Sequence, residues 1–149
     1  MSMTDMRSMI NKQAGINVAH SLTEKNPTQV PYWIPTGSRW LDSIISRGEM
    51  AGIPGAKISE LAGLASTGKS YMAAQVAANA QKMGMDVIYF DSESAIDPEF
   101  LQNAGCNLDE LMYVQAMSVE FVLETIETLL ASNNNRMLFI WDSLALTPA

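Results

Sequence analysis

The chain has 149 residues, 48% hydrophobic and 17% charged, which is the size and composition of one globular domain. Its net charge of −7 disfavours broad, charge-driven binding to nucleic acid, and the single Cys106 and single His20 exclude an internal disulfide and argue against a zinc or haem site. The longest apolar run, at residues 137–141, is far shorter than the ~20 residues of a membrane-spanning helix, and no secretion signal opens the chain, so we expect a soluble cytoplasmic protein without membrane contact.

The first part of the chain, residues 1–35, is polar and weakly periodic. Pro27, Pro31 and Pro35 interrupt it. We therefore expect a short N-terminal helix followed by an irregular arm that lies outside the core. The remaining residues, 36–149, are expected to form a separate nucleotide-binding core.

The core pattern begins with a helix. Trp40, Leu41, Ile44 and Ile45 recur at helical spacing behind a candidate cap at Thr36, and a glycine at position 48 ends the helix. A loop rich in glycine and proline follows. The sequence then predicts a strand at residues 56–62 and an alanine-rich helix at residues 69–83. The small side chains of this helix would allow it to lie close to a sheet.

The second half alternates in the same way. Strands are predicted at residues 86–91, 111–115 and 137–141, and helices at 98–104 and 119–131. The strand at 86–91 is apolar through its centre, which is typical of a strand covered on both faces. Such alternation predicts an α/β fold, a parallel sheet flanked by crossover helices.

The strongest functional signal is a glycine-rich motif between the predicted strand at 56–62 and the predicted helix at 69–83. It fits the phosphate-loop pattern G-x-x-x-x-G-K-[ST] of P-loop NTPases. Glycines let the backbone N–H groups point at phosphate oxygens, the lysine neutralises the β and γ phosphates, and the last hydroxyl binds Mg²⁺. The motif consists of Gly63, Leu64, Ala65, Ser66, Thr67, Gly68, Lys69 and Ser70.

Asp142 ends the last apolar strand, at the carboxyl edge where open α/β sheets bind ligands. By itself such a residue is also compatible with a core strand that runs into a loop. Because a Mg²⁺ ion held by Ser70 needs an acidic partner, directly or through water, the phosphate loop favours Asp142 as that partner.

Glu93 follows the strand at 86–91 by two residues, so its carboxylate is expected to project into the same crevice. A water molecule that attacks a γ phosphate needs an acceptor to orient it, and Glu93 is the candidate general base. The alternative interpretation is a solvated acidic loop in which Asp97 caps the next helix.

These blocks resemble the RecA-type recombinases, and among them the phage branch typified by UvsX. The resemblance covers residues 34–149 and rests on four blocks: Thr36-Gly37-Ser38 with Leu41-Asp42, the phosphate loop, residues 90–98 and residues 141–148. The blocks occur in the order and spacing of that family. Together they are more specific than a phosphate loop alone.

The resemblance implies an ATP- and Mg²⁺-dependent enzyme that forms filaments on single-stranded DNA and exchanges strands with a homologous duplex, in the host cytoplasm if a phage encodes it. It implies that Lys69 and Ser70 bind phosphate and Mg²⁺, that Glu93 activates water and that Asp142 lies at the Mg²⁺ site. Asp97 matches a residue that contacts adenine. Phe100 stands where bacterial members carry a tyrosine that stacks on the base.

In that family the DNA-binding loops and a central strand of the sheet follow the point that Ala149 matches, so we expect the chain to be the front portion of a longer protein. By the same resemblance, residues 1–35 are expected to contact a neighbouring subunit. Two other interpretations stay open. One is another ATPase of the same fold, such as a helicase, a RadA-like protein or a KaiC-like protein. The other is a non-catalytic module that binds a nucleotide without hydrolysing it.

Overall fold

The computed structural model describes residues 1–23 and 29–149; part of the expected irregular arm, residues 24–28, lies outside the described residues. The described chain divides into two units, Met1–Pro31 and Tyr32–Ala149. The first unit contains the expected N-terminal helix, α1 (Met3–Ala14), which has no buried residue. Its start is a capping box, in which the Ser2 hydroxyl accepts a bond from the Asp5 N–H and the Asp5 carboxylate accepts one from the Ser2 N–H.

The second unit begins with a short antiparallel pair of strands. Strand β1 (Trp33–Ile34) pairs with β2 (Ile53–Pro54). The Ile34 side chain is only 2% exposed and belongs to the main hydrophobic cluster. The residues just before position 36, expected to lie outside the core, therefore contribute to it, because the β1–β2 pairing draws Ile34 inward.

Helix α2 (Arg39–Ile45) starts later than its sequence suggests. Its N-cap is Ser38, not Thr36. The Thr36 backbone N–H and hydroxyl instead donate to the Asp42 carboxylate at 2.8 and 2.6 Å, and both residues are buried. Trp40, although it lies at apolar helical spacing, is 84% exposed.

Replacement of Gly52 is expected to destabilise the fold strongly. It has a φ of +99°, and a Cβ atom there would overlap the backbone carbonyl of Ile34. We expect Gly52→Ala to destabilise the full-length protein by roughly 1 to 3 kcal/mol for overpacking, on top of about 1 kcal/mol for left-handed strain. Urea unfolding measures this cost. Gly48→Ala is the control, since Gly48 has a similar φ of +103° and a Cβ atom added there would meet no atom within 4 Å; equal losses for the two variants would contradict the prediction.

The prediction of a strand at residues 56–62 is wrong. The structure has no strand there, and Ile58 is fully exposed. Among the described residues, no strand pairs with this segment. Without a neighbour to accept its backbone hydrogen bonds, a strand-like sequence forms no ladder.

The parallel sheet has the strand order β4–β3–β5. Its strands are β3 (Asp86–Asp91), β4 (Leu111–Gln115) and β5 (Met137–Asp142), which match the predicted ranges closely. Strand β3 lies in the centre and is buried from its second residue onward. The α/β prediction, a parallel sheet flanked by helices, is confirmed.

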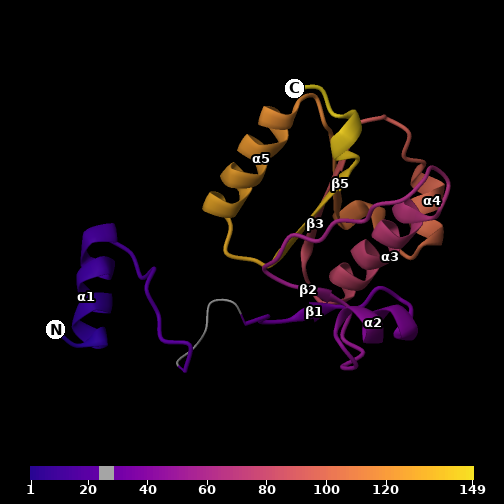
Figure 1. Cartoon of the computed structure of the whole chain (residues 1–149). Helices are drawn as coiled ribbons and strands as arrows, with labels where there is room; N and C mark the ends of the chain where they lie inside the picture. Colours follow the sequence, from indigo (N-terminus) through magenta and orange to yellow (C-terminus); the bar gives the residue numbers. More distant parts are fainter. Residues whose placement is uncertain (24–28) are drawn as a thin grey trace. The chain divides into compact units, whose positions relative to one another are not determined.

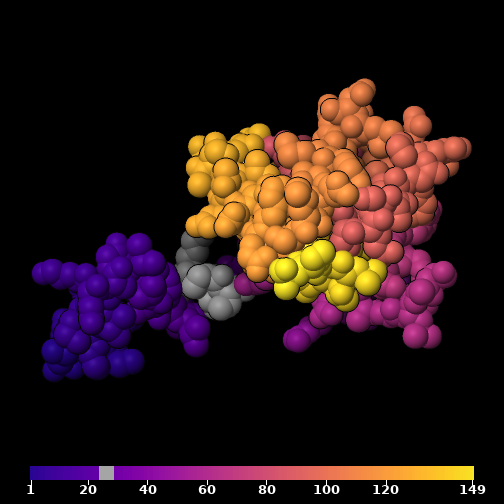
Figure 2. Space-filling model, turned by 90° about the horizontal axis from the view of Figure 1, so that it is seen from above, coloured from indigo at the N-terminus to yellow at the C-terminus, as the bar shows by residue number. Residues whose placement is uncertain are grey.

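Helices cover both faces of the sheet (Figure 1). Helix α3 (Lys69–Lys82) packs on one face through a row of buried alanines, and α5 (Val119–Ser132) covers the other through Val122. Helix α4 (Pro98–Asn103) follows β3, and single turns of 3₁₀-helix span Leu108–Glu110 and Leu144–Leu146. The C-terminal residues, yellow in Figure 2, lie against the start of α5, where the Val119 N–H donates to the Pro148 carbonyl at 2.9 Å.

Alternation along β3 sorts its side chains between the two helical layers. Tyr89 packs in the cluster with the α3 alanines, whereas Ile88 and Phe90 pack in the cluster with Val122 of α5. Since side chains two residues apart share a face, Asp91 lies on the α3 face with Tyr89. Asp142 pairs with Asp91 in the β3–β5 register and shares that face. The sheet therefore directs both carboxylates to the side that carries the phosphate-loop helix.

Candidate active site

The phosphate loop forms an exposed turn that closes around the lysine side chain. The Lys69 ammonium group donates to the carbonyl oxygens of Gly63 and Leu64 at 3.0 and 2.9 Å. The Thr67 hydroxyl also donates to the Leu64 carbonyl, at 2.8 Å. The loop thus curls back over the first turn of α3 and holds a positive charge within its bend.

The backbone of this loop adopts conformations that explain its glycines. Gly68, the N-cap of α3, has a φ of +91°, in the region that glycine adopts without strain. A Cβ atom at Gly63 would lie 3.1 Å from the Thr67 hydroxyl oxygen, which is tighter than an ordinary contact. The residues present therefore form a compact cradle for a small anion at a helix N-terminus, which is what a nucleotide phosphate requires.

Asp142 is held at the end of β5 through both its side chain and its backbone. Its Oδ2 atom accepts a bond from the Tyr89 hydroxyl at 2.9 Å, and its carbonyl oxygen accepts one from the Ser92 N–H at 3.0 Å. Burial, and then the negative charge of Asp142, raise the pKa of Tyr89 well above its ordinary value. Tyr89 therefore stays protonated and acts as a donor at neutral pH.

The segments that follow β3 and β5 are joined directly. The Ser92 hydroxyl donates to the Ser143 carbonyl at 3.0 Å, and the Ser143 N–H donates to the Ser92 hydroxyl at 2.9 Å. The peptide bond between Asp142 and Ser143 is cis. These bonds bring the loop that carries Glu93 next to Asp142, as the sequence predicts for two segments that leave the same edge of the sheet.

Asp91 organises the loop that carries Glu93. It is 2% exposed, and its two carboxylate oxygens accept bonds from the backbone N–H groups of Glu93 and Ile96 at 3.0 and 3.1 Å. The Tyr113 hydroxyl donates to the same carboxylate at 3.1 Å, and burial together with this bond raises the pKa of Tyr113. Asp91 thereby fixes the Glu93 backbone, while the Glu93 side chain stays exposed.

Asp97 and Phe100 lie in the first turn of α4. Asp97 is the N-cap, and its carboxylate accepts a bond from the Glu99 N–H at 2.9 Å, so the interpretation of Asp97 as a helix cap is confirmed. The Phe100 ring meets the Tyr71 ring edge to face, with 6.0 Å between the centroids. Because Tyr71 follows Ser70, this contact brings the α4 residues next to the first turn of α3.

Two groups of predicted site residues are thus assembled separately. The loop that carries Glu93 is joined to the segment after Asp142 by the bonds of Ser92 and Ser143, while the Glu93 side chain is exposed, and Phe100 meets the start of α3 through Tyr71. Within the described part of the chain, no hydrogen bond joins Lys69 or Ser70 to Glu93 or Asp142, and no three acidic, cysteine or histidine side chains cluster as metal ligands. Sequence patterns assign no role to Tyr89, Asp91, Ser92 or Ser143. The contacts of Tyr89, Ser92 and Ser143 depend on strand register, and those of Asp91 depend on the conformation of the turn after β3.

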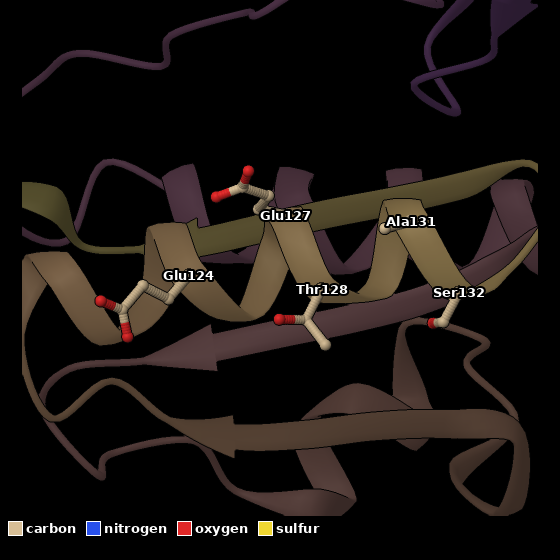
Figure 3. A pocket seen from close by; sticks show the side chains of 5 residues that line it. All are labelled: Glu124, Glu127, Thr128, Ala131 and Ser132. Atoms are coloured by element: carbon tan, nitrogen blue, oxygen red, sulfur yellow. The ribbon is translucent and has the colours of Figure 1, made fainter.

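Two surface hollows lie away from the predicted site residues. Figure 3 shows the larger one, on the exposed side of α5. A second hollow lies beside the amino-terminal ends of the sheet strands. The larger hollow is lined by Glu124, Glu127, Thr128, Ala131 and Ser132, none of which is a predicted site residue.

Comparison with known proteins identifies the family that combines this phosphate loop with this sheet. The family model of the RecA N-terminal domain matches residues 2–149. The chain belongs to the RecA family. The match also includes the N-terminal residues, in which the sequence blocks alone showed no resemblance.

The curated relatives agree with this assignment to the RecA family. Over 144 residues the chain is 36% identical to Protein RecA of Fusobacterium nucleatum, an overlap of 97% of this chain and 37% of the relative. It is 33% identical over 146 residues to the mitochondrial DNA repair protein recA homolog of Dictyostelium discoideum, an overlap of 98% of this chain and 32% of the relative. It is 34% identical over 141 residues to Protein RecA of Paracoccus denitrificans, an overlap of 95% of this chain and 39% of the relative. The chain therefore spans about a third of the length of these relatives. None of the helices in the described residues is long and apolar enough to cross a membrane.

Proposed function

We propose that this chain is the ATP-binding portion of an ATP-dependent DNA recombinase and repair protein. The observation that carries the proposal is the Lys69 ammonium group held by the carbonyls of Gly63 and Leu64, inside a complete phosphate-loop motif at the start of α3. Membership of the RecA family and the names of the relatives, Protein RecA and a mitochondrial DNA repair protein, support the recombinase assignment over a helicase or another ATPase of this fold.

The proposed binding residues are those of the phosphate loop, positions 63–70, together with Asp97 and Phe100 near the nucleotide base. Lys69 would exchange its carbonyl partners for phosphate oxygens, which are stronger acceptors because they are charged. Glu93 would accept a hydrogen bond from the attacking water, because Asp91 holds its backbone at the carboxyl edge of the sheet. Glu93 and Lys69 are the proposed catalytic residues.

Ser70 and Asp142 are the proposed residues on the Mg²⁺ side. Their hydroxyl and carboxylate oxygens are the hard donors that this ion prefers, and both side chains are partly buried on the α3 side of the sheet. When bound, Mg²⁺ supplies positive charge that offsets the charge developing on the phosphate oxygens.

The proposed partners are single-stranded DNA and further copies of the protein in a filament. With a net charge of −7, this chain is not expected to hold DNA by itself, so the proposal places the DNA contacts elsewhere in the full-length protein. We also propose a cytoplasmic location. A place in the phage branch of the family rests on the sequence blocks alone; the relatives named above are bacterial and mitochondrial.

The test is phosphate release by the full-length protein with ATP and Mg²⁺, with and without single-stranded DNA, followed by strand exchange with a homologous duplex. DNA-stimulated hydrolysis and formation of the exchanged product are expected. ATP binding without phosphate release under all these conditions would favour the non-catalytic nucleotide-binding module instead. Unwinding of a duplex without exchange would favour a helicase.

A further inference from the structure

The Tyr89 side chain joins the core of the sheet to the carboxylate of Asp142. Tyr89 lies on the central strand β3, is 0% exposed and packs in the cluster that contains the α3 alanines. In the β3–β5 register it stands opposite Ile140, so its hydroxyl reaches diagonally to the next residue on the same face, Asp142, at 2.9 Å. The ring thus fills the core, and the hydroxyl reaches the polar edge of the sheet.

Packing explains the ring of Tyr89 but not its hydroxyl. A phenylalanine would fill the same volume, and a buried hydroxyl group destabilises the fold unless it is hydrogen-bonded. Within the described residues, the hydrogen-bond partner of this hydroxyl is Asp142. The hydrogen bond to the Asp142 carboxylate therefore explains why a hydroxyl group is tolerated at this buried position.

The bond also restricts Asp142. Its backbone is already fixed through the Ser92 N–H, and Tyr89 binds one of its two carboxylate oxygens, Oδ2. A carboxylate held at one oxygen keeps a single orientation and presents the other oxygen in a fixed direction. Such support is what neighbouring groups commonly provide to residues at metal sites.

We propose that Tyr89 is a positioning residue that orients the Asp142 carboxylate for the Mg²⁺ that accompanies the nucleotide. This inference rests on the proposed function, which places Asp142 on the Mg²⁺ side of the site. It makes Tyr89 act on Mg²⁺ through Asp142, with no contact of its own to nucleotide or ion.

The experiment measures binding of a fluorescent ATP analogue to the full-length protein over a series of Mg²⁺ concentrations. For Tyr89→Phe we expect the Mg²⁺ concentration at half-maximal binding to rise about tenfold, the lower end of the effect of removing such a supporting group. Binding of the analogue in EDTA is expected to be unchanged, because Lys69 and the loop are intact. Thermal unfolding of the variant confirms that it is folded, since phenylalanine keeps the buried ring.

Tyr32→Phe is the matched control. It removes a phenol hydroxyl that makes no hydrogen bond within the described residues, and it should leave the Mg²⁺ requirement at the wild-type value. The decisive variant is Tyr89→Phe in an Asp142→Ala background, in which position 142 has no side-chain acceptor for the Tyr89 hydroxyl. If Tyr89 acts through Asp142, Tyr89→Phe has no further effect on the Mg²⁺ requirement there.

Two results would overturn the positioning role alone: a wild-type Mg²⁺ requirement in Tyr89→Phe, or an equal shift with and without the Asp142 carboxylate. Wild-type protein that binds no analogue at any Mg²⁺ concentration would overturn the proposed function, and this inference with it. Binding that Lys69→Ala abolishes, combined with a wild-type Mg²⁺ requirement in Tyr89→Phe, would leave the proposed function standing and refute only the role of Tyr89.

Discussion

Lys69→Ala is expected to lower ATP hydrolysis by the full-length protein about 100- to 1,000-fold and to abolish strand exchange. The ammonium group is held inside the bend of the phosphate loop by the carbonyls of Gly63 and Leu64, so the substitution removes a positive charge from that bend. Without it, the charge that develops on the phosphate oxygens loses its protein counter-charge. Phosphate release and the yield of exchanged DNA measure the two effects.

Lys82→Ala is the control for that variant. Lys82 is exposed in the last turn of the same helix, α3, and it carries the same charge. Its replacement should leave hydrolysis near the wild-type rate. Strand exchange that persists at the wild-type level in Lys69→Ala would show that the proposed mechanism is wrong.

Glu93→Gln should separate nucleotide binding from hydrolysis. The substitution keeps the size of the side chain and the Asp91 bond to the backbone, but it removes the carboxylate that we propose orients the attacking water. We expect the rate of hydrolysis to fall about 100- to 10,000-fold, the usual contribution of a general base, while ATP binding changes little. Single-turnover phosphate release and equilibrium ATP binding, measured on the same preparation, test both parts.

Glu99→Gln provides the comparison for Glu93→Gln. Glu99 lies in the first turn of α4, exposed, in the same acidic segment. If the segment acted only as a solvated acidic loop, the two substitutions would change hydrolysis to the same small extent. A selective loss in Glu93→Gln requires a specific role for that carboxylate.

The elements that could be predicted from the sequence are those whose burial follows from their own residues. Strand β3 is apolar through its centre and is covered on both faces, and the alanines of α3 fit close packing on a sheet. The segment at residues 56–62 mixes apolar and polar side chains, and a strand there would also need a neighbour; pairing partners are not encoded locally. Trp40 shows the same limit, since its helical spacing indicates a face but not whether anything covers that face.

The candidate site was predictable to the same degree. The phosphate-loop motif placed Lys69 and Ser70 at the start of α3, and the end of an apolar strand placed Asp142 at the carboxyl edge. The bond from Tyr89 to Asp142 joins residues 53 positions apart, and it exists only in the register that the two strands adopt. The residues that hold the site residues in place can therefore be identified only in the folded structure, not in the sequence.

In the strand arrangement β4–β3–β5, the central strand β3 can pair first with β4 or first with β5, and the two pairings differ in the chain entropy that they cost. The bond between Tyr113 and Asp91 closes a loop of 22 residues, whereas that between Tyr89 and Asp142 closes one of 53. Closing the shorter loop loses less chain entropy, and its residues leave the ribosome first. During synthesis, β3 and β4 are thus expected to pair and to fix the Glu93 loop before β5 has been made. The segment that carries Asp142 would then dock onto a β3–β4 pair that has already formed.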